Sequence, residues 1–204
     1  MKRTLSRFMA LVFAALALTS APHVLSTAAL AQAKPAVIAV IDTRRLFSES
    51  LVSKDIRSQL TQIAQTFGAE ENGVKEKLLK EKDELDKQRG LLVQEAYEQK
   101  YADLQQRAQK LNRQMDLHQK QLNLAQARAN RDLQKVLTPI ISDVADKKGV
   151  TVVLEKAQIV YQTTGLDITT EVIELLDKKL PTLKVQLPTE AEIMELERQA
   201  QQGD

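Results

Sequence analysis

The 204-residue chain contains no cysteine, and aromatic residues account for only 3% of it. The absence of cysteine excludes a disulfide framework, a thiolate metal site and a thiol nucleophile. The shortage of aromatic side chains limits the chain to a small hydrophobic core. Histidine occurs only at positions 23 and 118, which is too few for a common histidine-based metal site. We therefore expect no metal and no other cofactor.

Acidic residues are plentiful, yet they do not suggest catalysis. Asp83, Glu84 and Asp86 lie close together in a segment of mixed charge, KEKLLKEKDELDKQR. Such a segment is typical of a solvated helix face, and a carboxylate pair poised for acid–base chemistry is the weaker interpretation. We therefore predict that the protein is not an enzyme.

The first 31 residues have the pattern of a cleavable signal peptide. Three cations precede an apolar run over residues 8–18, which is too short to span a bilayer comfortably, and Ala29-Leu30-Ala31 fits a cleavage site. Cleavage after Ala33 and retention of the segment as an anchor are the alternatives. Because the leader holds three cations and no acid, its removal changes the formal net charge from +2 to −1. The near-neutral mature chain gives no indication of nucleic-acid binding.

One long amphipathic segment dominates the mature chain. From about Leu51 to about Val144 the apolar residues keep helical spacing, except near Gly90, where the sequence predicts a helix end. We expect residues 51–135 to form an antiparallel two-helix coiled-coil arm with its tip near residue 90. At about 1.5 Å per residue, helices of roughly 40–50 residues would extend about 60–75 Å. That length favours gripping or spacing over chemistry.

Both predicted arm helices carry an apolar seam with steps of three and four residues, as coiled coils do. The first seam contains Ile56, Leu60, Ile63, Phe67, Val74 and Leu78, and the second contains Tyr101, Leu104, Ala108, Leu111, Met115, His118, Leu122, Ala125 and Ala129. Alanine and histidine make the second seam thin, so it offers apolar area for one partner helix only. The pattern favours an exposed arm over a buried bundle.

Gly68 and Gly73 fall within the first arm helix. Each glycine costs a helix roughly 1 kcal/mol relative to alanine, so two of them close together predict a soft point. We interpret the pair as a hinge at which the arm bends. The alternative is that the glycines let the two backbones approach closely near Met115–Leu122.

Short β-like runs on both sides of the arm predict a body. Residues 32–50 supply its first part and residues 136–185 its second, with strands at Val37–Ile41, Thr151–Leu154 and Ile159–Tyr161 and a short helix at about Thr170–Leu180. Because so small a sheet is marginal on its own, we expect several subunits to share it. The residues predicted at this oligomer interface are Ile38, Val40, Val152, Leu154, Ile159 and Tyr161.

Apolar clusters near the predicted tip have no body to bury them. They either close the end of the hairpin or contact a bound chain, and the residues favour the two interpretations equally. Together with the neighbouring cations they form the candidate binding residues, which are Leu78, Leu79, Lys80, Lys82, Lys87, Arg89, Leu91, Leu92, Val93 and Tyr97.

Charge is segregated between two segments. Residues 107–135 hold seven cations and two acids, a net charge of +5, whereas residues 186–204 hold one cation and five acids, a net charge of −4. We expect the acidic, glutamine-rich segment 186–204 to be a loosely ordered tail. A cationic face could bind an anionic lipid or lipopolysaccharide, but Arg107, Lys110 and Arg113 drift around the helix, which weakens that hypothesis.

The order of these segments resembles the Skp/OmpH family of periplasmic chaperones for outer-membrane proteins. The resemblance rests on the export signal, on IAVIDTRRLFSES, on the long charged hairpin and on GVTVVLEKAQIVYQTTGLDITTEVIELL, and it covers about Val37–Leu180. The acidic tail after Pro188 lies outside the family core. The mature chain is also near neutral, where the best-known members are strongly basic.

The resemblance implies an α+β fold, predominantly helical, in which a small β-rich body forms a homotrimer and the helical arms protrude as tentacles. It implies an ATP-independent periplasmic holdase that encloses unfolded outer-membrane β-barrel proteins and prevents their aggregation, without enzymatic activity. An envelope coiled-coil adaptor is one alternative, although an adaptor is expected to have a more regular seam and no glycine pair. A protein that binds lipid or lipopolysaccharide is the other.

Overall fold

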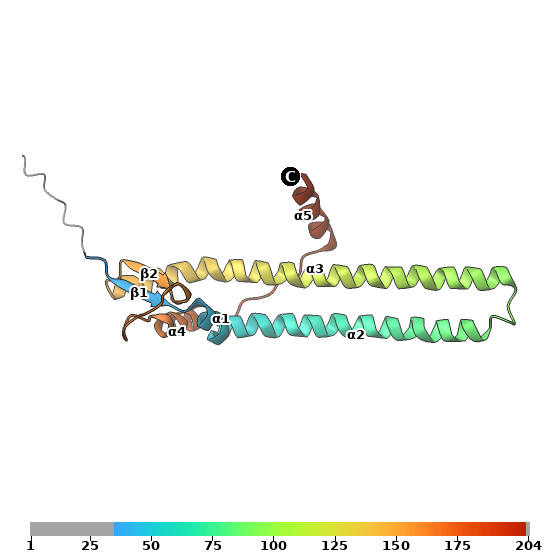
Figure 1. Cartoon of the computed structure of the whole chain (residues 1–204), viewed down its shortest axis with the longest axis horizontal. Coiled ribbons are helices and arrows are strands. Elements are labelled where there is room, and N and C mark those ends of the chain that lie inside the picture. The colour runs from blue at the N-terminus through green and yellow to red at the C-terminus, as the bar shows by residue number, and fades with distance from the viewer. Residues whose placement is uncertain (1–34, 203–204) are drawn as a thin grey trace, which may run out of the picture. The chain divides into compact units, whose positions relative to one another are not determined.

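A computed structural model describes residues 35–202 of the chain, so the predicted signal peptide lies outside the described residues. Within this range the elements follow in the order β1 (Ile38–Ile41), α1 (Thr43–Glu49), α2 (Leu51–Lys87), α3 (Gln94–Lys147), β2 (Val152–Glu155), the 3-10 helix η1 (Lys156–Gln158), α4 (Thr169–Lys179) and α5 (Glu190–Gln202) (Figure 1). The fold is predominantly helical with a small sheet, which confirms the predicted class at that level. None of the helices in this range is both long and apolar enough to cross a bilayer.

The two long helices, α2 and α3, lie side by side and form the arm (Figure 1). Arg107 on α3 donates hydrogen bonds to both carboxylate oxygens of Glu81 on α2, at 2.5 and 2.8 Å. Farther from the turn, the Nδ1 atom of His118 lies 2.8 Å from Oε1 of Glu71. The later residue of α3 thus pairs with the earlier residue of α2, so the two helices run antiparallel.

Residues 88–93 connect the two arm helices, since α2 ends at Lys87 and α3 begins at Gln94. In the outer part of the arm, the buried apolar side chains are Leu78, Leu85 and Leu111. So few buried side chains give the outer arm little hydrophobic stabilisation. This weak stabilisation of the outer arm follows from the thin apolar seam that the sequence predicts.

The base of the arm merges with a body core. α1, the first turns of α2, the last turns of α3, and α4 gather around β1 and β2 (Figure 1). The most deeply buried apolar side chains of this core include Leu46, Val52, Leu133, Ile140, Ile168, Val172 and Leu176. Gly149 follows the end of α3, and its φ of 66° is the left-handed conformation that glycine adopts most easily. The Gly149 and Val150 N–H groups donate back to Asp146 O and Ala145 O, at 3.1 and 2.9 Å, and so cap the helix.

The sheet is a parallel pair in which Ile38 lies opposite Val152. The other edge of β1 is also paired, because the Val40 N–H donates to Leu166 O at 2.8 Å and the Ile168 N–H donates to Val40 O at 2.9 Å. β1 is therefore the central strand of the body, between β2 and the segment that leads into α4.

Four polar residues tie the three chain segments of the body together. The Asp42 N–H donates to Thr169 Oγ1 at 2.9 Å, and Asp167 Oδ1 accepts from the Thr169 N–H at 2.9 Å. Lys156 follows β2 directly, with its Nζ 3.1 Å from Asp167 and 3.7 Å from Asp42. Burial raises the pKa of Asp167, but the hydrogen bonds from Thr169 and Lys156 outweigh it, so that the pKa lies below its usual range.

The third predicted strand, Ile159–Tyr161, is wrong. The 3-10 helix η1 turns the chain immediately after β2, and both edges of β1 are already occupied. Ile159–Tyr161 pairs with no strand among the described residues, although Ile159 keeps an extended conformation, with φ of −109° and ψ of 126°. Val160 and Tyr161 are consequently exposed.

The expectation of a loosely ordered C-terminal tail is also wrong, because residues Glu190–Gln202 form α5. Thr189 and Glu192 make a capping box, in which the Thr189 N–H donates to Glu192 Oε2 at 2.7 Å and the Glu192 N–H donates to Thr189 Oγ1 at 3.3 Å. Pro188 before the cap and Ile193 after it are both buried. Composition indicated disorder, but this local helix-starting pattern is the stronger determinant.

Candidate binding site on the helical arm

The tip of the arm is closed by polar and aromatic contacts, which leave apolar side chains exposed. The guanidinium of Arg89 lies 5.7 Å from the centre of the Tyr97 ring, and Tyr97 stacks on Tyr101 with ring centres 6.2 Å apart. Leu91 is 85% exposed, and Val93 is exposed beside it. The tip therefore presents apolar surface that its own packing does not use.

An apolar groove of about 390 Å³ runs between α2 and α3 below the tip. Apolar side chains from both helices line it, and polar side chains border them. The lining residues are Lys75, Leu78, Leu79, Lys82, Tyr101, Leu104, Gln105, Ala108, Leu111, Asn112 and Met115. Leu79, Tyr101 and Met115 remain exposed in the groove, because the thin seam does not cover them. The groove can accept an apolar side chain from another molecule.

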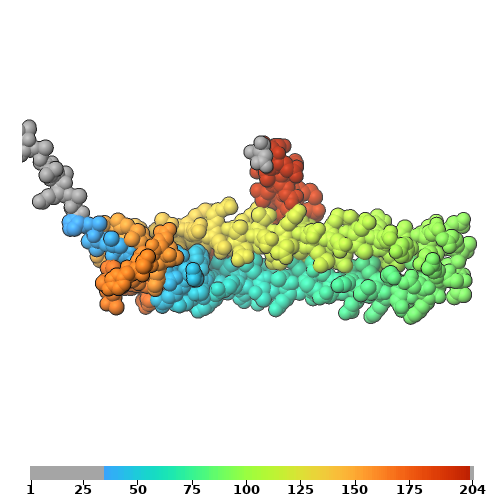
Figure 2. All heavy atoms as spheres, in the orientation of Figure 1, coloured from blue at the N-terminus to red at the C-terminus, as the bar shows by residue number. Residues whose placement is uncertain are grey.

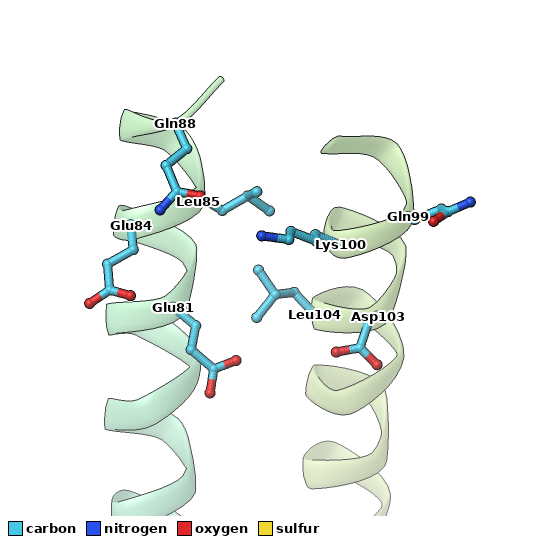
Figure 3. A pocket seen from close by; sticks show the side chains of 8 residues that line it. All are labelled: Glu81, Glu84, Leu85, Gln88, Gln99, Lys100, Asp103 and Leu104. Carbon is cyan, nitrogen blue, oxygen red and sulfur yellow. The ribbon is translucent and has the colours of Figure 1, made fainter. Parts of the chain in front are cut away.

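A second groove, of about 430 Å³, lies closer to the tip and has a more polar lining. Leu85, Lys100 and Leu104 point into the space between the two helices, with Glu81 and Asp103 alongside (Figure 3). Leu104 lines both grooves, so the apolar and the charged regions are contiguous. A chain lying along the arm would meet apolar and charged groups within a few residues.

Ion pairs border the two grooves. Lys82 pairs with Asp86 at 2.7 Å, and Lys87 pairs with Asp83 at 2.6 Å. The hydrogen bond from Lys82 lowers the pKa of Asp86, and the hydrogen bond from Arg107 lowers the pKa of Glu81. These side chains are about half exposed or more, so the pairs contribute little to stability and can exchange partners.

The predicted binding residues thus fall into different environments. Leu78 is only 9% exposed and packs between the arm helices, where it lines the apolar groove. Tyr97 is half-buried in the closing contacts of the tip. Leu79, Leu91 and Val93 are exposed, as direct contact would require. Sequence reasoning missed Met115 and Leu104 as groove residues, because their seam positions predicted internal packing.

The residues predicted at the oligomer interface of the body also fall into exposed and buried environments. Ile38, Val152 and Leu154 are exposed, on the face of the sheet opposite the core-facing Ala39 and Val153. Val40 is only 1% exposed and is buried within the chain, so it cannot form an intersubunit contact as predicted. The loop between Leu166 and Ile168 pairs with β1, the strand that contains Val40. The sequence did not predict this loop as a neighbour of β1.

Neither glycine of the predicted hinge adopts a conformation that only glycine allows, because the described positive-φ glycines are Gly149 and Gly165. A Cβ atom added at Gly68 or Gly73 would meet nothing within 4 Å. The alternative explanation, a close approach of the two backbones, is therefore excluded.

A two-helix arm on a small α+β body is the architecture that the comparisons with known proteins match. The family model described as outer membrane protein, OmpH-like, matches residues 37–176. The chain therefore belongs to the OmpH-like family.

One solved structure illustrates the similarity. It comes from Caulobacter crescentus CB15 and is described as a candidate outer membrane chaperone, OmpH-like. It is 27% identical to this chain, with a TM-score of 0.73, and the similarity covers 76% of this chain and 91% of that chain. No curated protein matches the chain.

Proposed function

We propose that the protein is an ATP-independent holdase chaperone of the periplasm, which holds unfolded outer-membrane β-barrel proteins between its arms and prevents their aggregation. The apolar groove at Leu79, Tyr101 and Met115 carries this proposal, because it leaves apolar surface open on an arm whose own packing does not need it. Membership of the OmpH-like family supports it. No catalytic step is part of the proposal.

The physical basis of holding is many weak contacts. An unfolded barrel protein exposes alternating apolar residues and unpaired strand edges, which aggregate. The arm offers apolar pockets bordered by exchangeable ion pairs, so no single contact dominates and many sequences can bind. A chain held in this way stays mobile and can pass to a more stable destination.

We further propose that three subunits assemble through the body. The exposed apolar residues Ile38, Val152 and Leu154, together with the exposed Val160 and Tyr161, support an interface there. Anionic lipid or lipopolysaccharide is not part of the proposal, because Lys120 and Arg128 of the cationic segment already pair with Glu197 and Glu192.

Light scattering of an unfolded outer-membrane β-barrel protein, diluted from denaturant with and without this protein, tests the proposed function. Wild type should suppress the scattering, and more strongly as its concentration rises. The double variant Leu79→Gln and Met115→Gln should need several-fold more protein, because it removes the apolar lining of the groove. Met194→Gln, which changes a similarly exposed side chain on α5, is the matched control and should act as wild type. Failure of the wild type to suppress scattering would contradict the proposal.

A further inference from the structure

The last part of the chain crosses the arm and contacts both of its helices. On α2, Asp55 Oδ2 accepts from the Leu183 N–H at 3.1 Å, and Gln59 accepts from the Val185 N–H and donates to Leu183 O, both at 2.9 Å. Val185 and Pro188 are buried at this crossing. On α3, Gln121 Nε2 donates to Pro188 O at 2.9 Å. Residues 183–188 are therefore a firmly held tether, and they lie beyond the residues that the family model matches.

The helix α5 that follows is attached much less deeply. Ile193 is 3% exposed and is the buried side chain of the helix, whereas Met194 is 52% exposed and Leu196 is exposed as well. Figure 2 shows α5, in red, standing on the surface of α3 with much of its length outside the arm. A helix that buries so little of its apolar surface can detach from α3 more easily than the tether can detach from the arm.

Opposite charges favour the position of α5 on the surface of α3 around Lys120 and Arg128, which we call its seat. Glu197 pairs with Lys120 at 2.6 Å, and Glu192 lies 3.4 Å from Arg128, so two acids of α5 meet two cations of α3. These cations belong to the segment 107–135 with its net charge of +5, and α5 belongs to the segment with −4. The hydrogen bond to Glu197 also raises the pKa of Lys120. All four side chains are between about one-third and one-half exposed, so salt screens the pairs and they can exchange.

We propose that the surface of α3 around Lys120 and Arg128 is a docking site for acidic amphipathic helical segments, and that α5 is its built-in competitor. The tether keeps α5 at a high effective concentration beside a seat that binds it only weakly. A segment of another chain with acids spaced around one apolar anchor would have to displace α5. The site would then admit segments of this chemistry only when they bind better than α5 does.

Binding of the chain's own α5 as a separate peptide tests the docking site without any client. A fluorescein-labelled peptide of residues 187–202 is titrated with full-length protein, and its anisotropy is measured. Ile193→Asp should release the internal α5 and bind the peptide about tenfold or more tightly than wild type does. Met194→Asp, with the same charge change at an exposed neighbour, should bind the peptide as wild type does.

Charge reversal locates the site. In the Ile193→Asp background, Lys120→Glu with Arg128→Glu should weaken peptide binding about tenfold or more, whereas the matched reversal of Lys110 and Arg113 should leave most of it. Equal binding by wild type and Ile193→Asp would overturn the proposal, and so would an absence of binding to Ile193→Asp at millimolar peptide. Equal losses in the two reversals would also overturn it.

Thiol protection gives an independent measurement, because the chain has no native cysteine. Ile193→Cys should react with a thiol reagent at least about tenfold more slowly than Met194→Cys, and saturating unlabelled peptide should remove that protection. Protection that the peptide does not change would contradict an exchangeable seat. Protection that disappears on dilution would place α5 on a second copy of the chain and overturn the intramolecular assignment. None of these results depends on suppression of client aggregation.

Discussion

At the scale of single residues, the body is held by a few polar side chains at the junctions of its segments. Asp42 follows β1, Asp167 and Thr169 precede and open α4, and Lys156 opens η1 directly after β2. The Asp42–Thr169 hydrogen bond and the Lys156–Asp42 ion pair join segments that lie more than a hundred residues apart in sequence, and Asp167 links Lys156 to Thr169. Asp42 and the triplet Asp167-Ile168-Thr169 lie within the two sequence stretches on which the family resemblance rests, and these contacts give them a structural role.

Asp167→Asn tests this junction. The substitution replaces charge-assisted hydrogen bonds with neutral ones and should lower the free energy of unfolding by about 1–3 kcal/mol. Urea denaturation followed by circular dichroism measures the loss. Asp116→Asn, at an exposed position on α3, is the control and should change stability by less than about 0.5 kcal/mol.

The same residue gives a pH dependence with a definite sign. Because the pKa of Asp167 is lower in the folded than in the unfolded chain, the unfolded chain takes up the proton first on acidification. The stabilisation is therefore complete above about pH 5 and disappears as the pH falls through the unfolded and then the folded pKa. The stability difference between wild type and Asp167→Asn should shrink over that acidic range and stay constant from pH 5 to 8. A difference that grew on acidification would refute the assignment.

At the scale of elements, the arm is a long helix pair with little to hold its outer part together. Its periodic apolar residues made the two helices and their turn predictable, because helical spacing persists over many residues. Burial of individual seam positions was not predictable, since Met115 and Leu111 share the same spacing and only Leu111 is buried. The false strand at Ile159–Tyr161 has a related cause: local composition reports β-propensity but not whether the segment is placed to pair with another strand.

The C-terminal helix α5 was not predicted, although a local pattern in the sequence indicates it. Acidic and glutamine-rich composition suggested disorder, but the sequence PTEAEI contains a capping box followed by an apolar residue. That short signal would have placed the start of α5 correctly. The contacts of the preceding tether with α2 and α3 depend on side chains such as Gln59 and Gln121, whose pairing no local pattern reveals.

The glycines of α2 give a prediction at this scale. Gly68→Ala and Gly73→Ala should each raise the free energy of unfolding by roughly 1 kcal/mol, because the backbone is helical and an added Cβ meets no neighbour. Gly149→Ala is the contrasting control and should lower it by about 1–2 kcal/mol, because φ is 66° there.

The hinge hypothesis gives a further prediction for the variants Gly68→Ala and Gly73→Ala. Spin labels near Gly90 in the assembled protein, measured by pulsed electron resonance, should show a narrower distribution of tip-to-tip distances in the double alanine variant. An unchanged distribution would show that the arm does not bend at these glycines.

At the scale of the whole molecule, the proposed trimer depends on the outer face of the sheet. Leu154→Asp places a charge on an exposed apolar surface and should dissociate the assembly while the helicity of the arm persists. Val40→Asp should instead unfold the body, at a cost of about 4 kcal/mol or more, because Val40 is buried within the chain. Sedimentation equilibrium and circular dichroism separate the two outcomes. A monomeric wild type at micromolar concentration, or an intact trimer in Leu154→Asp, would contradict this interface.

The central claim is that the arms, and not the body, hold the client. The direct test replaces residues 68–115 with a short turn, which joins Phe67 to Asp116 and keeps the stacking of Phe67 on His118, 3.7 Å between ring centres, as the new end of the arm. The body, the tether contacts of Asp55 and Gln59 and the seat of α5 all remain in this variant. The measurement is light scattering of an unfolded outer-membrane β-barrel protein diluted into each protein at equal trimer concentration. We predict that the shortened protein still sediments as the wild-type oligomer but no longer suppresses aggregation. Undiminished suppression by the shortened protein would place the binding site on the body and contradict the account.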